Sequence, residues 1–81
     1  MMPPLSQFKR LDVRPLLARG EEPLGLIRER VAALPAGHGL IVVAPFLPSP
    51  LIELMKSQGF QSRLERGTGT DWIVYFWAEV A

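Results

Sequence analysis

The spacing of apolar residues changes several times along the chain, and each change predicts a boundary between elements. Residues 8–13, FKRLDV, alternate in part between apolar and polar positions, which predicts a first strand. We expect residues 14–22 to form a loop. Pro23 then suits the first position of a helix, because a residue at that position needs no N–H donor. Apolar residues continue after it at helical spacing, at Leu24, Ile27, Val31 and Leu34.

A continuous apolar run marks the middle of the chain. The stretch Leu40–Pro45, LIVVAP, is short and rich in β-branched residues, which predicts the best-buried strand of a sheet. A second helix is expected after it, with Ser49 as its N-cap and Pro50 in its first position. Gly59 fits the left-handed position that ends this helix. Its inward residues are expected to be Leu51, Leu54 and Met55.

The C-terminal part of the chain predicts a hairpin, with strands at Phe60–Arg66 and Asp71–Val80 and the turn GTGT between them. The predicted order is β-α-β-α-β-β. Because crossovers between parallel strands are right-handed, both helices are expected on one face of the sheet. The predicted fold class is therefore α/β, more narrowly an α+β two-layer sandwich with a mixed four-stranded sheet. The last strand is expected to run antiparallel to the others and to pair with the third.

The last predicted strand is apolar on both faces, although one layer of helices covers only one face of a sheet. The other face is either a contact surface for another protein or a second copy of the chain, or a tolerated apolar surface. In the second case the stems of Arg63 and Glu65 would partly cover it. The candidate residues of this open-sheet interface are Trp72, Ile73, Tyr75 and Trp77.

The length and the distribution of prolines set the organisation of the chain. Its 81 residues correspond to one domain. We expect residues 1–6 to be disordered, because their prolines contribute nothing to a sheet, and residues 7–81 to form the single domain. The first residues contain no apolar leader segment, and prolines and glycines interrupt the apolar stretch 31–52. We therefore expect a cytoplasmic protein without a membrane-spanning segment.

Charge and cysteine content narrow the possible functions. Nine Lys and Arg against eight Asp and Glu leave a net charge of +1, which is too small to attract nucleic acid by itself. The chain has no cysteine, which excludes a disulfide framework, a thiolate zinc site and a thiol nucleophile. We expect no nucleic-acid partner and no cofactor.

Three segments resemble a known family when taken in order. They are LDVRPL in the first strand, EPLGLIRERVAALPAGHGLIVVAP over the first helix and second strand, and PLIELMKSQGF over the second helix. Their order and spacing resemble the sulfur-carrier proteins of the TusA and SirA type. More narrowly, they are similar to an uncharacterised domain-of-unknown-function branch of that superfamily, which lacks the carrier thiol. The resemblance runs from about Leu11 to the C-terminus.

The resemblance also identifies a missing group. Sulfur carriers have Cys-Pro-x-Pro before their first helix, and its cysteine carries a persulfide for transfer to a partner. Aligned on its final proline, this motif falls on GEEP, so that Gly20 takes the place of the cysteine, Glu21 that of the first proline, and Pro23 matches. Because no cysteine stands elsewhere, the resemblance implies the fold without the sulfur relay.

The two glutamates beside this vacated position have two interpretations. Glu21 and Glu22 precede the positive end of the first predicted helix, where carboxylates complement the helix dipole and cap free N–H groups. Alternatively, they form an acidic docking point for a cationic partner or a metal. Two adjacent carboxylates are not a catalytic pair without convergent geometry, so we expect no general acid–base chemistry from them.

The remaining candidate residues are a histidine and two arginines. His38 is the only histidine and lies between glycines, which is typical of a solvated loop residue. Asp12 and Arg14 are expected to form structural ion pairs, with a ligand contact by Arg14 as the alternative. Arg19 is the candidate for a mobile contact beside Gly20.

The leading hypothesis is a small non-catalytic interaction or regulatory domain, with another protein as partner and with homodimerisation through the open sheet face as one form of it. The alternative is a module that binds a small molecule or a metal with the loop and the N-terminus of the first helix, although no metal site is identifiable. An enzyme is not expected, because no nucleophile and base occur at recognisable spacing. The candidate contact residues are Arg14, Arg19, Gly20, Glu21, Glu22, Pro23 and His38.

Overall fold

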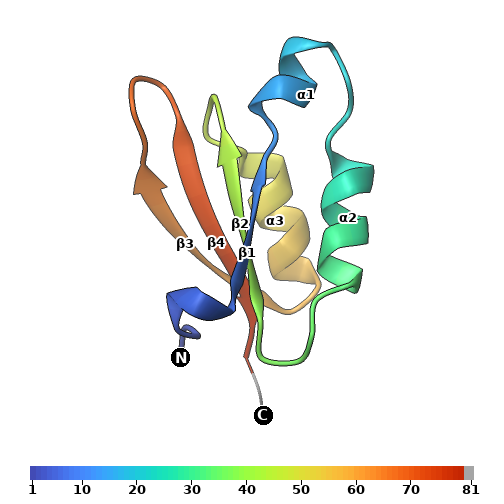
Figure 1. The fold of residues 1–81 in the computed structure, drawn as a ribbon, viewed down its shortest axis with the longest axis vertical. Coiled ribbons are helices and arrows are strands. Elements are labelled where there is room, and N and C mark those ends of the chain that lie inside the picture. Colours follow the sequence, from blue (N-terminus) through green and yellow to red (C-terminus); the bar gives the residue numbers. More distant parts are fainter. Residues whose placement is uncertain (80–81) are drawn as a thin grey trace.

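The computed structural model describes residues 1–79, which form one four-stranded sheet with helices on one side (Figure 1). The predicted β-α-β-α-β-β order is confirmed, with one short α-helix and one 3-10 helix added. The predicted last strand includes Val80, which lies outside the described residues. The elements are η1 (Leu5–Gln7), β1 (Phe8–Asp12), α1 (Arg14–Ala18), α2 (Leu24–Ala32), β2 (Gly39–Ala44), α3 (Ser49–Ser57), β3 (Phe60–Arg66) and β4 (Trp72–Ala78).

The strands lie in the order β1-β2-β4-β3. β1 pairs with β2 in parallel, whereas β4 pairs with both β2 and β3 in antiparallel orientation. The predicted pairing of the last strand with the third is therefore confirmed. β4 therefore lies inside the sheet, between β2 and β3.

The core lies between the sheet and the helices. Alternate residues of β2 and β4 point toward α2 and α3, and among them Val74 and Phe76 are fully buried. Ile27 from α2 and Met55 from α3 close the core from the helical side, each only 2% exposed. The predicted apolar stripe of the first long helix and the predicted burial of the LIVVAP strand are both confirmed.

The prediction of a loop over residues 14–22 is wrong in part, because α1 occupies Arg14–Ala18. Pro15 fits the first turn of this helix, where its missing N–H is not needed. The two long helices, α2 and α3, each begin one residue away from the predicted start. Pro23 precedes the first helical residue of α2, and α3 already begins at Ser49 after Pro48.

The first residues run beside the end of β4. The amino group of Met1 lies 2.5 Å from Oε1 of Glu79, and η1 follows before β1 begins. Disorder of residues 1–6 concerns their mobility in solution and stays a prediction. Within residues 1–79, no helix has the length and apolar character needed to cross a membrane.

Candidate functional site

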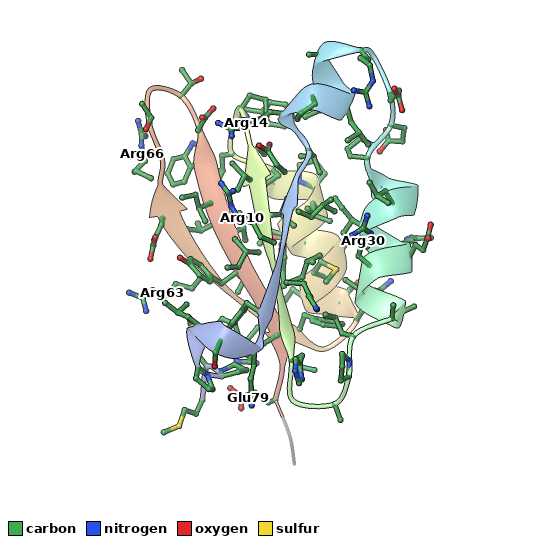
Figure 2. The ribbon with its side chains drawn as sticks, viewed as in Figure 1. Arg10, Arg14, Arg30, Arg63, Arg66 and Glu79 are labelled. Carbon is green, nitrogen blue, oxygen red and sulfur yellow. The ribbon has the colours of Figure 1, made fainter. Side chains whose placement is uncertain are left out.

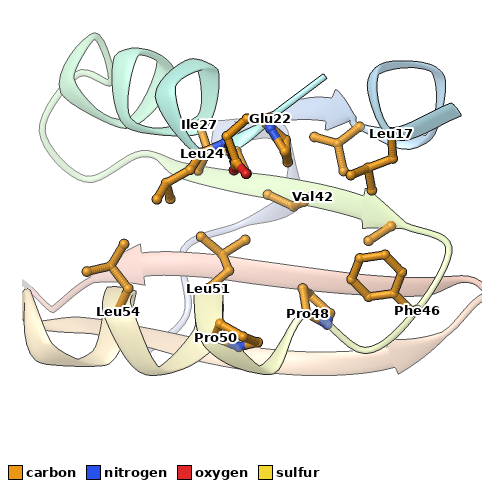
Figure 3. A pocket seen from close by; sticks show the side chains of 13 residues that line it. Leu17, Glu22, Leu24, Ile27, Val42, Phe46, Pro48, Pro50, Leu51 and Leu54 are labelled. Atoms are coloured by element: carbon orange, nitrogen blue, oxygen red, sulfur yellow. Dashed lines mark hydrogen bonds between the residues drawn. The ribbon is translucent and has the colours of Figure 1, made fainter. Parts of the chain in front are cut away.

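An apolar groove lies between α2 and α3, and its floor is β2 (Figure 3). The hollow between the two helices has a volume of about 300 Å³ and reaches down to Val42 and Ala44, which are each only 1% exposed. This volume stands at the lower limit of typical ligand pockets and suffices for a few apolar side chains. The lining residues are Val13, Leu17, Glu22, Pro23, Leu24, Ile27, Val42, Ala44, Phe46, Pro48, Pro50, Leu51 and Leu54.

The proline-rich connection between β2 and α3 forms one wall of the groove. Pro48 is buried there, whereas the neighbouring Phe46 lies at the rim with 51% of its surface exposed. Leu51 and Leu54 continue this wall along α3 (Figure 3). A large apolar side chain that stands half exposed beside an apolar hollow is typical of a contact surface.

Glu22 is the one charged residue among those that line the groove. Its Oε1 accepts a hydrogen bond of 2.9 Å from the backbone N–H of Leu24 at the start of α2. The predicted capping role is therefore confirmed for Glu22. Glu21 does not cap the helix in this way, because its carboxylate pairs with Nε of Arg19 at 2.5 Å on the exposed surface.

Gly20, the residue in place of the carrier cysteine, ends α1. Its φ of 76° is left-handed, a conformation that glycine adopts without steric cost. The N–H of Gly20 bonds to the carbonyl of Leu17, and the N–H of Glu21 bonds to that of Leu16, both at 3.0 Å. These two bonds form a Schellman motif with Gly20 in the C′ position. The position therefore has a backbone role that the sequence alone did not reveal.

Arg14 links the end of β1 to the residue that precedes β4 through its side chain. Its guanidinium donates to both carboxylate oxygens of Asp12 at 2.9 and 2.6 Å, and to Oδ2 of Asp71 at 2.6 Å. The hydrogen bonds from Arg14 lower the pKa of Asp12 to about 2. The structural pairing predicted for these two residues is present, and each of the three guanidinium nitrogens of Arg14 donates to Asp12 or Asp71.

The candidate ligand residues do not converge on one site. His38 precedes β2, whereas the N-terminus of α2 lies near the other end of that strand, roughly 17 Å away for a strand of this length. The Nδ1 of His38 lies 3.3 Å from the carbonyl oxygen of Ala36. No group of three or more carboxylates and histidines that could hold a metal occurs within the described part of the chain.

The face of the sheet opposite the helices carries three of the four predicted interface residues. Ile73, Tyr75 and Trp77 lie on it, whereas Trp72 lies on the opposite face with Arg66 stacked 4.7 Å above its ring. The inclusion of Trp72 in one interface with the other three is therefore wrong. The reason is the two-residue period of a strand, which turns Trp72 toward the helical side with Val74.

The aromatic residues of the open face are partly covered by their neighbours. The ring of Phe8 meets that of Tyr75 edge to face, with 5.6 Å between centroids. The hydroxyl of Tyr75 donates to Glu65 at 3.2 Å, and burial raises the pKa of that hydroxyl. Trp77 is only 8% exposed and donates from Nε1 to Glu79 at 3.3 Å.

The sequence predictions missed most of the groove. Leu24, Leu51 and Leu54 were expected to point inward, but the gap between α2 and α3 depends on their separation, which periodicity does not encode. Phe46 carried a signal, because a large aromatic residue between prolines in a turn is seldom needed for the turn itself.

Comparison with curated proteins and with solved structures gives no match. A family model described as "Uncharacterized conserved protein (DUF2249)" matches residues 10–78. The matched segment runs from β1 to the end of β4 and includes every residue that lines the groove. The chain therefore belongs to the uncharacterised conserved family DUF2249.

Proposed function

We propose that this protein is a small non-catalytic interaction domain that binds an apolar segment of a partner protein in the groove between α2 and α3. The observation that carries the proposal is the groove itself. Twelve of its thirteen lining residues are apolar, and burial of such surface on association is favourable by about 25 cal/mol per Å².

The shape of the region favours a polypeptide over a small molecule as the ligand. Small-molecule sites enclose most of their ligand, whereas Phe46 and Leu47 stand exposed beside this groove, at 51% and 39%. A partner segment covers both the hollow and these rim residues at once. Exposed apolar surface of this kind is typical of protein contacts.

The carboxylate of Glu22 at one wall of the groove favours a partner segment with a basic residue. Glu22 lies at the α2 side of the groove, and its Oε1 is occupied by the N–H of Leu24. Its other carboxylate oxygen has no hydrogen-bond partner within residues 1–79. We expect the bound segment to place a lysine or arginine beside Glu22.

The resemblance to sulfur carriers supports a regulatory form of this function. When the sequence is aligned with the sulfur-carrier motif, Gly20 takes the place of the persulfide-bearing cysteine. Leu17 and Glu22, on either side of Gly20, line the groove. We propose that the domain retains a docking surface of the carrier scaffold and uses it without sulfur transfer. Its role would then be to bind a partner of such carriers or to compete for it.

A random peptide library displayed on phage tests the proposal. Peptides selected on the wild-type protein are expected to combine apolar residues with one basic residue. Phe46→Ser is expected to reduce their binding at least about fivefold, since it removes an exposed apolar side chain from the contact. Leu64→Ser is the matched control, because Leu64 is similarly exposed, at 45%, but does not line the groove.

Two outcomes would overturn the proposal. One is selection of peptides that bind Phe46→Ser and the wild type equally well while both proteins remain folded by circular dichroism. The other is failure to select any peptide, together with a thermal shift by a panel of small apolar molecules that Phe46→Ser abolishes, which would assign the groove to a small ligand.

A further inference from the structure

The open face of the sheet has a regular charge pattern in addition to its aromatic residues. The open face consists of the residues of β1 to β4 that point away from α2 and α3. Two neighbouring cross-strand rows make up its centre. The first row contains Arg10, Ile41, Tyr75 and Arg63, and the second contains Asp12, Val43, Ile73 and Glu65.

Each row is apolar on the two central strands and charged on the two edge strands. Val43 is only 3% exposed, so the accessible apolar surface comes from the partly exposed Ile41, Ile73 and Tyr75. The first row has a cation at both ends, and the second row has an anion at both ends. Arg10 and Arg63 are exposed and are labelled in Figure 2. Within residues 1–79, neither has a carboxylate within 4.0 Å. The open face thus presents two unpaired cations next to two partly exposed carboxylates. Both oxygens of Asp12 already accept from Arg14, and Oε1 of Glu65 accepts from the hydroxyl of Tyr75.

We propose that the open face binds the open face of a second copy of this chain, in a two-fold symmetric contact. The symmetry axis lies in the plane between the two sheets, perpendicular to the strands, and passes between the two rows. Each strand then faces the same strand of the second copy, running in the opposite direction. Symmetric contacts of this kind use one self-complementary surface on both copies.

This axis pairs every edge charge with its opposite. Arg63 faces the second copy's Glu65, and Arg10 faces the second copy's Asp12. Because the contact is two-fold, each pair occurs twice. In the centre, Tyr75 faces the second copy's Ile73, which buries apolar surface against apolar surface. Two sheets pack about 10 Å apart, a distance that an arginine and a carboxylate side chain bridge together.

The alternative two-fold axis is excluded by the same charges. An axis parallel to the strands would place Arg10 of one copy over Arg63 of the other, and Asp12 over Glu65. Like charges held face to face disfavour such a contact. The pattern therefore specifies one relative orientation of the two copies.

The size of the open face sets the expected strength of the contact. Four strands of about five to six residues cover roughly 350 Å² in projection. A standard interface buries about 800 Å² per partner, so this contact is smaller and we expect a dissociation constant on the order of tens of micromolar. Salt should weaken the dimer, because at 1 M salt the attraction between charges is screened beyond about 3 Å.

Sedimentation analysis of the full chain over a concentration series tests the proposal. The wild type is expected to shift from monomer to dimer with concentration. Arg63→Glu and Glu65→Arg should each weaken the dimer at least about tenfold, since each change turns two attractive pairs into repulsive ones. The double variant with both changes restores opposite charges and should recover the wild-type constant within about threefold. Arg28→Glu, on the exposed side of α2, is the control for net charge.

The result that overturns the proposal is a protein that stays monomeric at all concentrations, or a dimer that Arg63→Glu and Arg28→Glu affect equally. Failure of the double variant to recover would also overturn it, provided that the variant is folded. This inference does not rest on the groove. Phe46→Ser should dimerise like the wild type, and Arg63→Glu should bind the selected peptides like the wild type, so that the two proposals fail separately.

Discussion

Replacement of Gly20 by alanine measures the backbone role of the position that the carrier cysteine would occupy. A Cβ at Gly20 meets no atom within 4 Å, so the substitution adds no steric clash with the rest of the chain. Its cost comes from the φ of 76°, since a left-handed conformation costs an L-residue about 1–2 kcal/mol. Reduced freedom of the unfolded chain offsets about 0.4–1 kcal/mol of this. We expect a net loss of about 1 kcal/mol in the free energy of unfolding.

Gly25 provides the matched control. It lies in α2, it is exposed, and a Cβ there also meets no atom within 4 Å. Its φ is not left-handed. Gly25→Ala should therefore stabilise the protein, by about 0.5 kcal/mol, because glycine within a helix costs about 0.5–1 kcal/mol relative to alanine.

Urea denaturation of the wild type and both variants gives the comparison. In a domain of this size, 1 kcal/mol corresponds to about 4–8 °C in Tm, so the opposite signs are resolved in thermal melts as well. Gly20→Cys should lose as much as Gly20→Ala, which means that a thiol at this position works against the local backbone. Equal stabilisation by Gly20→Ala and Gly25→Ala would refute the reasoning, because it would show that Gly20 does not need its positive φ.

Three further predictions concern the sheet. Because Arg14 lowers the pKa of Asp12 to about 2 from an unfolded value near 4, ionised Asp12 contributes fully above pH ~4, and its contribution is lost as the pH falls toward ~2. Between pH 5 and pH 2, the free energy of unfolding should therefore fall less for Asp12→Asn than for the wild type. The expected difference is about 1 kcal/mol, because the pair is partly exposed. An equal fall in both proteins contradicts the assignment. Asp71→Asn should lose about 0.5–1 kcal/mol in urea denaturation, and a neutral effect would show that the bridge from Arg14 to the β3–β4 turn does not contribute. Gly39→Ala should cost about 1–3 kcal/mol in the same assay, because its Cβ would lie 2.4 Å from the ring of Phe8 and 2.6 Å from the carbonyl oxygen of Phe76; an unchanged midpoint would refute this close packing.

The elements that the sequence predicted are those with a strong local signal. The run from Leu40 to Ala44 is apolar at every position, and the structure buries all of it except Ile41, which is partly exposed. Gly59 has the positive φ that its place after a helix predicted. α1 carried no such signal, because five residues are too few to show a helical period and its end depends on the hydrogen bonds around Gly20.

The groove and the open face depend on placement that one sequence does not encode. The position of β4 between β2 and β3 turns Arg10 and Arg63 into the two ends of one row, although they are far apart in the chain. Phe46 similarly becomes a rim residue only because α2 and α3 stay apart over β2. The sequence predicted that the last strand is apolar and that glutamates precede the first long helix. It did not predict the groove or the open face that these elements help to form.

Amide chemical shifts on addition of a selected peptide test the central proposal most directly, namely that the groove binds an apolar segment. We predict that the largest shifts fall on Val42, Ala44, Leu51 and Leu54, with small changes at Tyr75 and Arg63. Largest shifts at Tyr75 and Arg63, with an unchanged groove, would contradict the proposal and move peptide binding to the open face.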